Sequence, residues 1–363
     1  MSEERKQYAS AECLQNDILT LCSVSSISGF EYRGSEKVKE IYGKYFDEIM
    51  TDSVGNQLLI KRCGRENAPK ILVDSHFDEV GLMVTDVLEG GFLRVTNVGG
   101  IDPAIMQAAD VLVYGKEVLR GVVISTPPHL RAGGNGKLTP VGDLLLDVGL
   151  GYTLDELKAL VPIGAPVGYT PVYSLMNGKF MAGKAFDDKA CGAIAARAII
   201  DTPKEELAGD VYLTLSAREE TARPGGVCCA VFNVEPDYAF VIDVELAKAP
   251  DVAGGRNPKL GGGISVAFSA ATDRELTRMT AALLEEKEVA FVRHASPSST
   301  GTNSTTVNLV RKGVPTVDIG LPLRNMHTYN EVLHLEDCNS LCGAVREFIC
   351  SREIAERFAE VER

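Results

Sequence analysis

Long apolar runs, Cys-x-x-Cys pairs and tryptophan are all absent from this 363-residue sequence. A helix that crosses a membrane needs about 20 consecutive, mostly apolar residues, so an ordinary membrane span is excluded. The opening residues, MSEERKQYAS, also lack the apolar segment of a secretory signal. Nine cysteines, an odd number, predict reduced thiols rather than a disulfide framework. We therefore expect a cytoplasmic protein.

Basic residues are scarce relative to acidic ones. The sequence has 37 Lys and Arg against 50 Asp and Glu, which gives a net charge of −13 at pH 7. Binding to a phosphate backbone or an anionic membrane needs a concentrated basic face, and the sequence shows no such cluster. We therefore expect neither nucleic acid nor a membrane as a partner.

The composition that is present, 45% hydrophobic and 24% charged residues, is ordinary for a globular protein. Amphipathic helices are expected at 8–22 and 31–45, followed by β-rich segments at 54–61 and 70–76. Residues 80–180 then break into short strand-like pieces punctuated by Gly and Pro. This texture is typical of a small β-barrel or sandwich.

Alternating helices and strands return after residue 183. Helices are expected at 188–200, near 225–232, at 273–287, near 304–311 and at 336–351, and strands at 210–217, 237–243, 289–294 and 314–320. This rhythm predicts a doubly wound α/β fold with a mixed sheet. The simplest arrangement is one α/β domain made of residues 1–79 and 181–363, interrupted by an inserted small β-barrel domain at 80–180.

Polar side chains stand where the apolar strand 70–76 ends. The run Ile71-Leu72-Val73 is followed by His76 and Asp78, and ligands in open α/β sheets bind outside the carboxyl ends of strands. The two residues alternate at the strand period and face the same way, so Asp78 can orient the imidazole of His76. Taken alone, such a pair is more often structural.

The further candidates all lie at strand ends, at a helix start or in a loop after a strand, namely Asp187, Glu219, Glu220, Asp243 and His327. Each has an ordinary alternative explanation. An Asp suits a helix N-cap, paired glutamates in a loop are usually solvated, and a single His is usually a surface residue. Surface positions are expected for the remaining histidines, which are His129, His294 and His334.

These alternatives weaken if the candidates converge at one edge of the sheet. Two histidines and three carboxylates suit Zn, Co or Mn better than Ca or Mg. With one carboxylate bridging, five ligands serve two metal ions about 3.5–4 Å apart, as in co-catalytic hydrolases. Neighbouring residues in an extended segment point in opposite directions, so one of Glu219 and Glu220 can bind a cation while the other faces a substrate.

Seven segments, in order and at suitable spacing, make the sequence similar to the tetrahedral (TET) dodecameric aminopeptidases, which include glutamyl aminopeptidases and proteins labelled cellulase M. They are SGFE, SHFDEVGLMV, PPHL, AFDDKACG, REE, VIDV and GLPLRNMHTYNEV, and they extend over nearly the whole chain. The resemblance implies an aminopeptidase fold with an inserted β-barrel dimerisation domain. It also implies a hollow dodecamer with interior active sites that act on short peptides.

The resemblance further implies a role for each candidate ligand. His76 and Asp243 would be the terminal ligands of one divalent metal ion, and Glu220 and His327 would hold the other. Asp187 would bridge the two ions. The ions would be Zn, Co or Mn, and a metal-bridging hydroxide would attack the peptide bond.

Two catalytic roles follow from the same resemblance. Glu219 would be the general base that takes a proton from the bridging water and returns it to the leaving amine, and Asp78 would orient His76. The sequence departs from the family pattern at three positions. Asp188 and Lys189 stand where Asn and Arg are common, and Asn303 replaces the Asp of a Gly-Thr-Asp motif.

Two other functions stay open at this point. A glycoside hydrolase is suggested by the cellulase label and by the many carboxylates, but such enzymes need no metal and no histidines. The absence of Trp also disfavours a sugar site. A non-catalytic metal-binding relative is suggested by Asn303 and by the altered loop EETARPGG after the REE motif.

Overall fold

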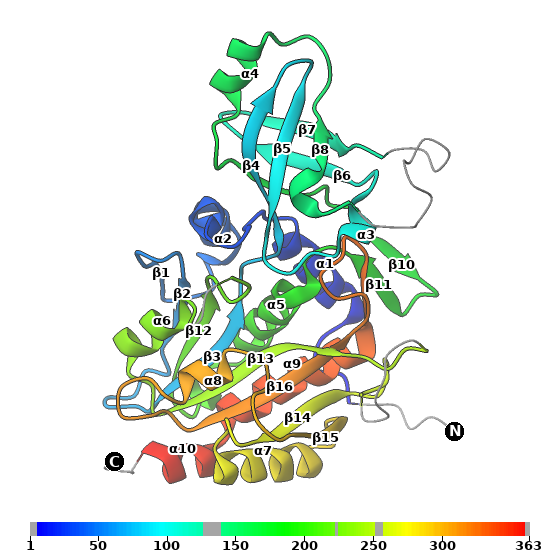
Figure 1. The fold of residues 1–363 in the computed structure, drawn as a ribbon. Coiled ribbons are helices and arrows are strands. Elements are labelled where there is room, and N and C mark those ends of the chain that lie inside the picture. The colour runs from blue at the N-terminus through cyan, green and yellow to red at the C-terminus, as the bar shows by residue number, and fades with distance from the viewer. Residues whose placement is uncertain (1–5, 126–138, 222–223, 251–256, 360–363) are drawn as a thin grey trace.

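The computed structural model describes residues 6–125, 139–221, 224–250 and 257–359 (Figure 1). Its largest element is an eight-stranded sheet in the order β1-β2-β12-β3-β13-β16-β14-β15. The strands are β1 (Glu48–Thr51), β2 (Gln57–Lys61), β3 (Lys70–His76), β12 (Asp210–Ser216), β13 (Tyr238–Leu246), β14 (Ile264–Ser269), β15 (Phe291–Ser296) and β16 (Thr316–Leu323). The neighbours β12, β3, β13 and β16 are parallel, whereas β2 and β14 join them antiparallel, so the sheet is mixed.

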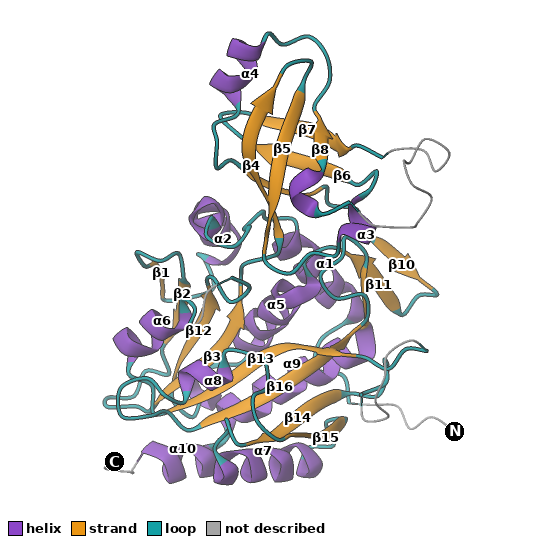
Figure 2. Cartoon of the chain, viewed as in Figure 1, coloured by secondary structure: helices purple, strands orange, loops and turns teal. Residues whose placement is uncertain are grey.

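Helices cover both faces of this sheet (Figure 2). One face carries α1 (Ala11–Cys22), α2 (Ser35–Tyr42), α5 (Phe186–Asp201), α7 (Arg274–Glu286), α9 (Leu335–Cys350) and α10 (Arg352–Ala359). The other face carries α6 (Val227–Val234) and α8 (Ser304–Val307). Strand β3 is buried along nearly its whole length, which explains its continuous apolar sequence. The predicted doubly wound α/β fold is confirmed.

Helix α5 packs close to the sheet because small residues line it. A Cβ added at Gly192 would lie 2.7 Å from the Leu215 side chain and 3.2 Å from Ser75 Oγ. Glycine therefore permits this close approach, and the start of the helix is held near the ends of β3 and β12. In the described ranges, no helix combines the length and apolarity needed to cross a membrane.

The segment after β3 forms a closed barrel in the order β4-β5-β8-β7-β6-β9. Its strands are β4 (Gly81–Leu88), β5 (Phe92–Val98), β6 (Asp110–Tyr114), β7 (Val118–Val123), β8 (Leu145–Asp147) and β9 (Pro166–Tyr169), with α3 (Pro103–Met106) and α4 (Leu154–Leu160) beside them. A core of its own, including the fully buried Leu93, Val113 and Leu146, fills it. The inserted small barrel is therefore confirmed, while the domain limits at 80 and 180 stay a prediction.

A third, three-stranded sheet joins β10 (Ser174–Met176), β11 (Phe180–Gly183) and β17 (Glu331–His334). Short 3-10 turns lie at Glu31–Gly34, Val141–Asp143 and Lys204–Glu206. All nine cysteines, each within the described ranges, are free thiols.

The structure differs from the predicted elements at several places. The helix expected near 304–311 ends at Val307, and the positive φ angles of Arg311 (57°) and Gly313 (90°) prevent its continuation beyond residue 310. Strand β14 was not predicted, since the apolar run 264–269 directly follows a glycine-rich loop. Strand β1 and helix α10 were also missed, and the segment 31–45 is a 3-10 turn followed by the short α2.

Candidate metal centre

Strand β3 ends at His76, which places the imidazole at the carboxyl edge of the sheet. The side chain is 2% exposed. Nδ1 lies 3.0 Å from the backbone oxygen of Asp78 and 3.6 Å from Oδ1 of the Asp78 carboxylate. A backbone acceptor at Nδ1 leaves Nε2 unprotonated in the neutral ring, and Nε2 is then free to bind a cation.

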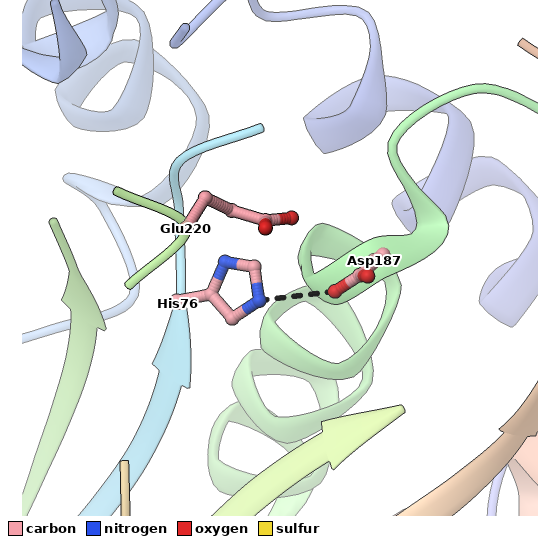
Figure 3. A group of neighbouring side chains, drawn as sticks. All are labelled: His76, Asp187 and Glu220. Atoms are coloured by element: carbon pink, nitrogen blue, oxygen red, sulfur yellow. Dashed lines mark hydrogen bonds and ion pairs between the residues drawn. The ribbon is translucent and has the colours of Figure 1, made fainter. Parts of the chain in front are cut away.

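Asp187, at the start of α5, faces both candidate histidines. Its Oδ1 lies 3.0 Å from Nε2 of His76, and its Oδ2 lies 3.3 Å from Nε2 of His327. Figure 3 shows His76, Asp187 and Glu220 converging from three different elements. A carboxylate whose two oxygens face two imidazoles has the arrangement that a bridging ligand needs.

A buried glutamate, Glu331 on β17, holds the two segments that carry these groups. Its Oε2 accepts the backbone N–H of Phe186 at 2.7 Å and of Asp187 at 3.1 Å, and its Oε1 accepts the N–H of His327 at 2.9 Å. Glu331 is only 2% exposed. Sequence reasoning missed this residue, although it lies within the GLPLRNMHTYNEV motif.

Glu219 and Glu220 follow β12, and Asp78 fixes the backbone of both. The Asp78 carboxylate accepts the N–H of Glu219 at 3.0 Å and that of Glu220 at 3.1 Å. Glu220 turns toward the other predicted ligands, with Oε1 3.2 Å from Nε2 of His327. Burial raises the pKa of Glu219 to about 7, and the nearby carboxylates of Glu220 and Asp78 add to the effect.

Asp243 on β13 also lies near the His76 imidazole, with its Oδ1 3.8 Å from Nε2 of His76. The ligand atoms of His76, Asp188 and Asp243 lie within 4.8 Å of one another, and so do those of His76, Asp187 and Glu220. Asp188 was not expected to be a ligand. Its Oδ2 accepts the Ser75 hydroxyl at 2.6 Å, and its Oδ1 is buried with no partner among the residues described.

The acids and imidazoles of this site shift one another's pKa values. Burial opposes ionisation of Asp187, but hydrogen bonds from His327 and His76 outweigh it and hold its pKa below the usual range. Contacts with Asp187 and Glu220 raise the pKa of His327 to about 11. Burial lowers the pKa of His76, yet its contacts with Asp187 and Asp243 reverse the sign and raise it well above normal.

The donor set fits divalent cations. Burial and neighbouring carboxylates raise the pKa of Asp243 and of Asp188 well above normal, so the site is short of positive charge. Closely spaced buried carboxylates are costly unless a cation neutralises them. Mixed imidazole and carboxylate ligands suit Zn, Co or Mn. The structure thus brings all five predicted ligands together at one sheet edge, with Glu219 next to them.

Lys189, one of the departures from the family pattern, belongs to a buried cluster next to this site. Its ammonium group donates to the Val24 carbonyl at 2.7 Å and to Oε1 of Glu79 at 2.9 Å. The ammonium of Lys184 contacts the other oxygen of Glu79. Two cations and one carboxylate are therefore packed between β3 and the start of α5.

Asn303 lies beneath the ends of β3 and β12 and is 6% exposed. Its amide donates to Oδ2 of Asp74 and to Oγ of Ser216, both at 2.9 Å. Burial raises the pKa of Asp74 to about 7. Where the family pattern has the carboxylate of an Asp, this chain has an amide, and the nearby carboxylate is that of Asp74 on β3.

The remaining histidines do not share one environment. His334 is buried, and its side chain accepts the N–H of Glu336 at the start of α9, so the predicted surface position was wrong. His294 is partly buried and lines the same cavity of about 500 Å³ as His76. His129 and the PPHL segment lie outside the described residues.

Comparisons with known proteins identify the family. A sequence model of the M42 glutamyl aminopeptidases matches residues 55–342. A lysyl aminopeptidase from Pyrococcus furiosus is 28% identical over 320 residues, which are 86% of this chain and 90% of the relative. The crystal structure of a TET aminopeptidase from Thaumarchaeota archaeon SCGC AB-539-E09 superposes with a TM-score of 0.87 at 25% identity, covering 96% of this chain and 100% of that one.

A further solved structure is the TET1 peptidase of Pyrococcus horikoshii. It is 26% identical with a TM-score of 0.79, and the alignment covers 93% of this chain and 99% of that one. That peptidase can assemble into a tetrahedron or a large octahedral shell.

Proposed function

This chain belongs to the M42 glutamyl aminopeptidase family, and we propose that it removes N-terminal residues from short peptides with the help of two divalent metal ions. One observation carries the proposal. The two carboxylate oxygens of Asp187 face Nε2 of His76 and Nε2 of His327 at 3.0 and 3.3 Å, and Glu219 lines the same cavity.

The proposed ligands divide into two sets that share one bridge. His76 and Asp243 would hold one ion, Glu220 and His327 the other, and Asp187 both. Zn, Co and Mn all suit these donors. Bound ions would polarise the scissile carbonyl and make water a better nucleophile near neutral pH.

Glu219 is the proposed general base. It lies in the turn after β12, directly before Glu220, and lines the cavity beside the proposed ligands. A pKa raised by burial lets its carboxylate accept a proton from water and return it to the leaving amine near neutral pH. Asp78 has a positioning role, because it fixes the Glu219 amide and contacts the imidazole of His76.

The proposed assembly is a homododecamer built from dimers through the barrel domain, residues 80–180. The barrel projects away from the α/β layers in Figure 1 and exposes several large apolar side chains, namely Val118, Val122, Leu150 and Ile163. Exposed apolar patches of this kind favour association. The tetrahedral assembly of the Pyrococcus horikoshii relative supports the same arrangement, and enclosed sites would exclude folded proteins.

The deciding experiment combines metal removal with one substitution. Purified protein is treated with a chelator and assayed on aminoacyl and oligosaccharide substrates, before and after Zn, Co or Mn is added back. We expect peptide hydrolysis to disappear with the metal and to return with it. Oligosaccharide cleavage that persists in chelator would instead support a glycoside hydrolase.

Glu219→Gln separates an enzyme from a non-catalytic metal-binding relative. The variant should lose hydrolysis while it still binds metal, as measured by elemental analysis. Glu286→Gln, at an exposed position on α7, is the matched control. Unchanged hydrolysis by Glu219→Gln would refute the proposed base.

A further inference from the structure

A second group of polar side chains lines the same cavity as the proposed metal ligands. Glu245 on β13, His294 on β15 and Asp318 on β16 share its wall with His76 and Asp187. Glu245, His294 and Asp318 have no role in the proposed metal site or in proton transfer. They therefore face the part of a bound substrate that would extend past the proposed metal site.

The sheet places Glu245 at a defined distance from the metal site. Glu245 and Asp243 are two residues apart on β13, so they point to the same face about 6–7 Å apart along the strand. The residue opposite Asp243 on β16 is Gly320. A Cβ added at Gly320 would lie 2.4 Å from Ser265 Oγ and 2.7 Å from Glu245 Cβ. Glycine at this position thus provides the space that the Glu245 side chain occupies.

Asp318 is the second carboxylate in this part of the cavity. It is 4% exposed and accepts hydrogen bonds from the hydroxyls of Thr302, Thr300 and Ser304. Hydroxyl donors satisfy the oxygens but bring no positive charge. His294 lies close enough to Asp318 to interact with it electrostatically, and its buried Nδ1 has no partner within the described part of the chain.

The described residues that line this cavity include no Lys and no Arg. A substrate with an acidic first side chain would bring a third negative charge to Glu245 and Asp318. An apolar side chain would displace water from both carboxylates without replacing its hydrogen bonds. A cationic side chain would satisfy both acids and would be favoured over the other two classes.

Resting on the proposed function, we propose that Glu245 and Asp318 select peptides whose first residue is lysine or arginine. The α-amino end of such a peptide would lie at the metal site, and its side chain would extend along β13 to Glu245. An extended lysine or arginine side chain is long enough to span the two-residue separation between Asp243 and Glu245. Glu245 is the principal determinant, because three hydroxyls already engage Asp318, whereas the Ser265 hydroxyl is the one side-chain hydrogen bond to Glu245 among the described residues.

The first test uses the metal-loaded wild-type protein and aminoacyl p-nitroanilides of arginine, lysine, norleucine and glutamate. Norleucine has nearly the length of lysine but no charge. We expect kcat/KM for arginine and lysine to exceed that for norleucine about tenfold to a hundredfold, which is the range of a charge-assisted hydrogen bond. Glutamate should be the poorest substrate. A preference for norleucine or glutamate would overturn the proposal.

The second test changes Glu245 and follows ratios of kcat/KM, which do not depend on the fraction of active protein. Glu245→Gln should lower the arginine-to-norleucine ratio about tenfold, and Glu245→Lys should shift the preference toward glutamate. Glu286→Gln should leave the ratio unchanged. An arginine-to-norleucine ratio that Glu245→Gln leaves unchanged would remove Glu245 as the determinant.

Calorimetric titration with free arginine, norleucine and glutamate gives a readout that needs no turnover. Arginine should bind most tightly to the wild-type protein and lose that advantage in Glu245→Gln. If every anilide resists hydrolysis, the proposed function fails, and the order of binding still decides the preference. Equal binding of arginine and norleucine would contradict the preference even in an active enzyme.

Discussion

The carboxylate of Asp78 accepts the backbone N–H of Glu219 at 3.0 Å, so a residue just beyond β3 sets the position of the proposed base after β12. The other carboxylate oxygen accepts the N–H of Glu220 at 3.1 Å. The same residue contacts Nδ1 of His76 through its backbone oxygen. Through its side chain and its backbone oxygen, Asp78 thus positions the proposed base and two proposed metal ligands.

Asp78→Asn should lower kcat about 10- to 100-fold, the usual effect of removing a group that orients metal ligands. An Asn side chain offers one acceptor oxygen, so the amide of Glu219 or of Glu220 must lose its partner. Steady-state kinetics and elemental analysis check this outcome. Asp86→Asn, exposed on the barrel, serves as control. Wild-type kcat in Asp78→Asn would argue against a positioning role.

The acidic limb of the pH–rate profile should belong to Glu219. Burial raises its pKa to about 7, and a general base works only when ionised, so kcat should fall as the pH drops through that value. Bound cations favour the ionised form and move the limb below pH 7. Glu219→Gln should abolish the limb and reduce kcat about 10²- to 10⁴-fold. A limb that persists in the variant would belong to another group.

Glu79→Gln should destabilise the protein by about 3–5 kcal/mol, because it leaves the buried ammonium groups of Lys184 and Lys189 without their carboxylate. Burial would raise the pKa of Glu79, but the two ammonium groups outweigh it and lower the pKa to about 2. The contribution of Glu79 is therefore complete above about pH 4.5 and is lost as the pH falls toward 2.

Chemical unfolding at pH 7 and pH 3 measures this effect, with Glu286→Gln as the exposed control. The difference in unfolding free energy between wild type and Glu79→Gln should shrink at the lower pH. A loss of less than about 1 kcal/mol at pH 7 would contradict the assigned role, since breaking a buried pair costs several times more.

Glu31→Gln should stabilise the protein at alkaline pH but not at acidic pH. Glu31 is 1% exposed, and burial raises its pKa to about 7 from 4.5. Because the folded pKa is the higher one, the ionised carboxyl costs nothing below about pH 4.5 and costs most above pH 7. The gain should reach about 1–3 kcal/mol at pH 8.

The substitution suits this test because one oxygen of Glu31 accepts both the Gly29 and the Arg218 amides at 2.9 Å. A glutamine carbonyl oxygen can accept the same two bonds. Unfolding curves at pH 4 and pH 8 give the comparison. Equal effects of Glu31→Gln at the two pH values would show that the carboxyl does not titrate between them.

The sequence predicted the polar groups that follow apolar strand segments, although β13 continues past Asp243 to Leu246. His76 and Asp243 each follow an uninterrupted run of buried residues, and that local pattern places a polar side chain at the sheet edge whatever the rest of the fold does. The barrel could also be predicted from the sequence, because frequent Gly and Pro between short β-rich runs indicate tight turns.

Contacts between segments that are far apart in the sequence could not be predicted from the sequence. Glu331 meets the Asp187 amide across a separation of 144 residues, and only the tertiary arrangement brings them together. The space that Gly320 leaves for the Glu245 side chain depends on the register between β13 and β16, which sets Gly320 opposite Asp243. Part of that information was local, however, since Glu245 shares a strand face with Asp243 and could have been flagged by alternation.

Because Glu331 ties the Asp187 and His327 amides to one carboxylate, we expect the chain to fold before the proposed metal ions bind. The backbone on either side of the proposed metal site is already held by a protein group, so a bound ion would not have to position these two segments. Such a chain could complete its folding before the proposed ions bind. On the proposed function, one divalent ion could also replace another without a change in the backbone around the site.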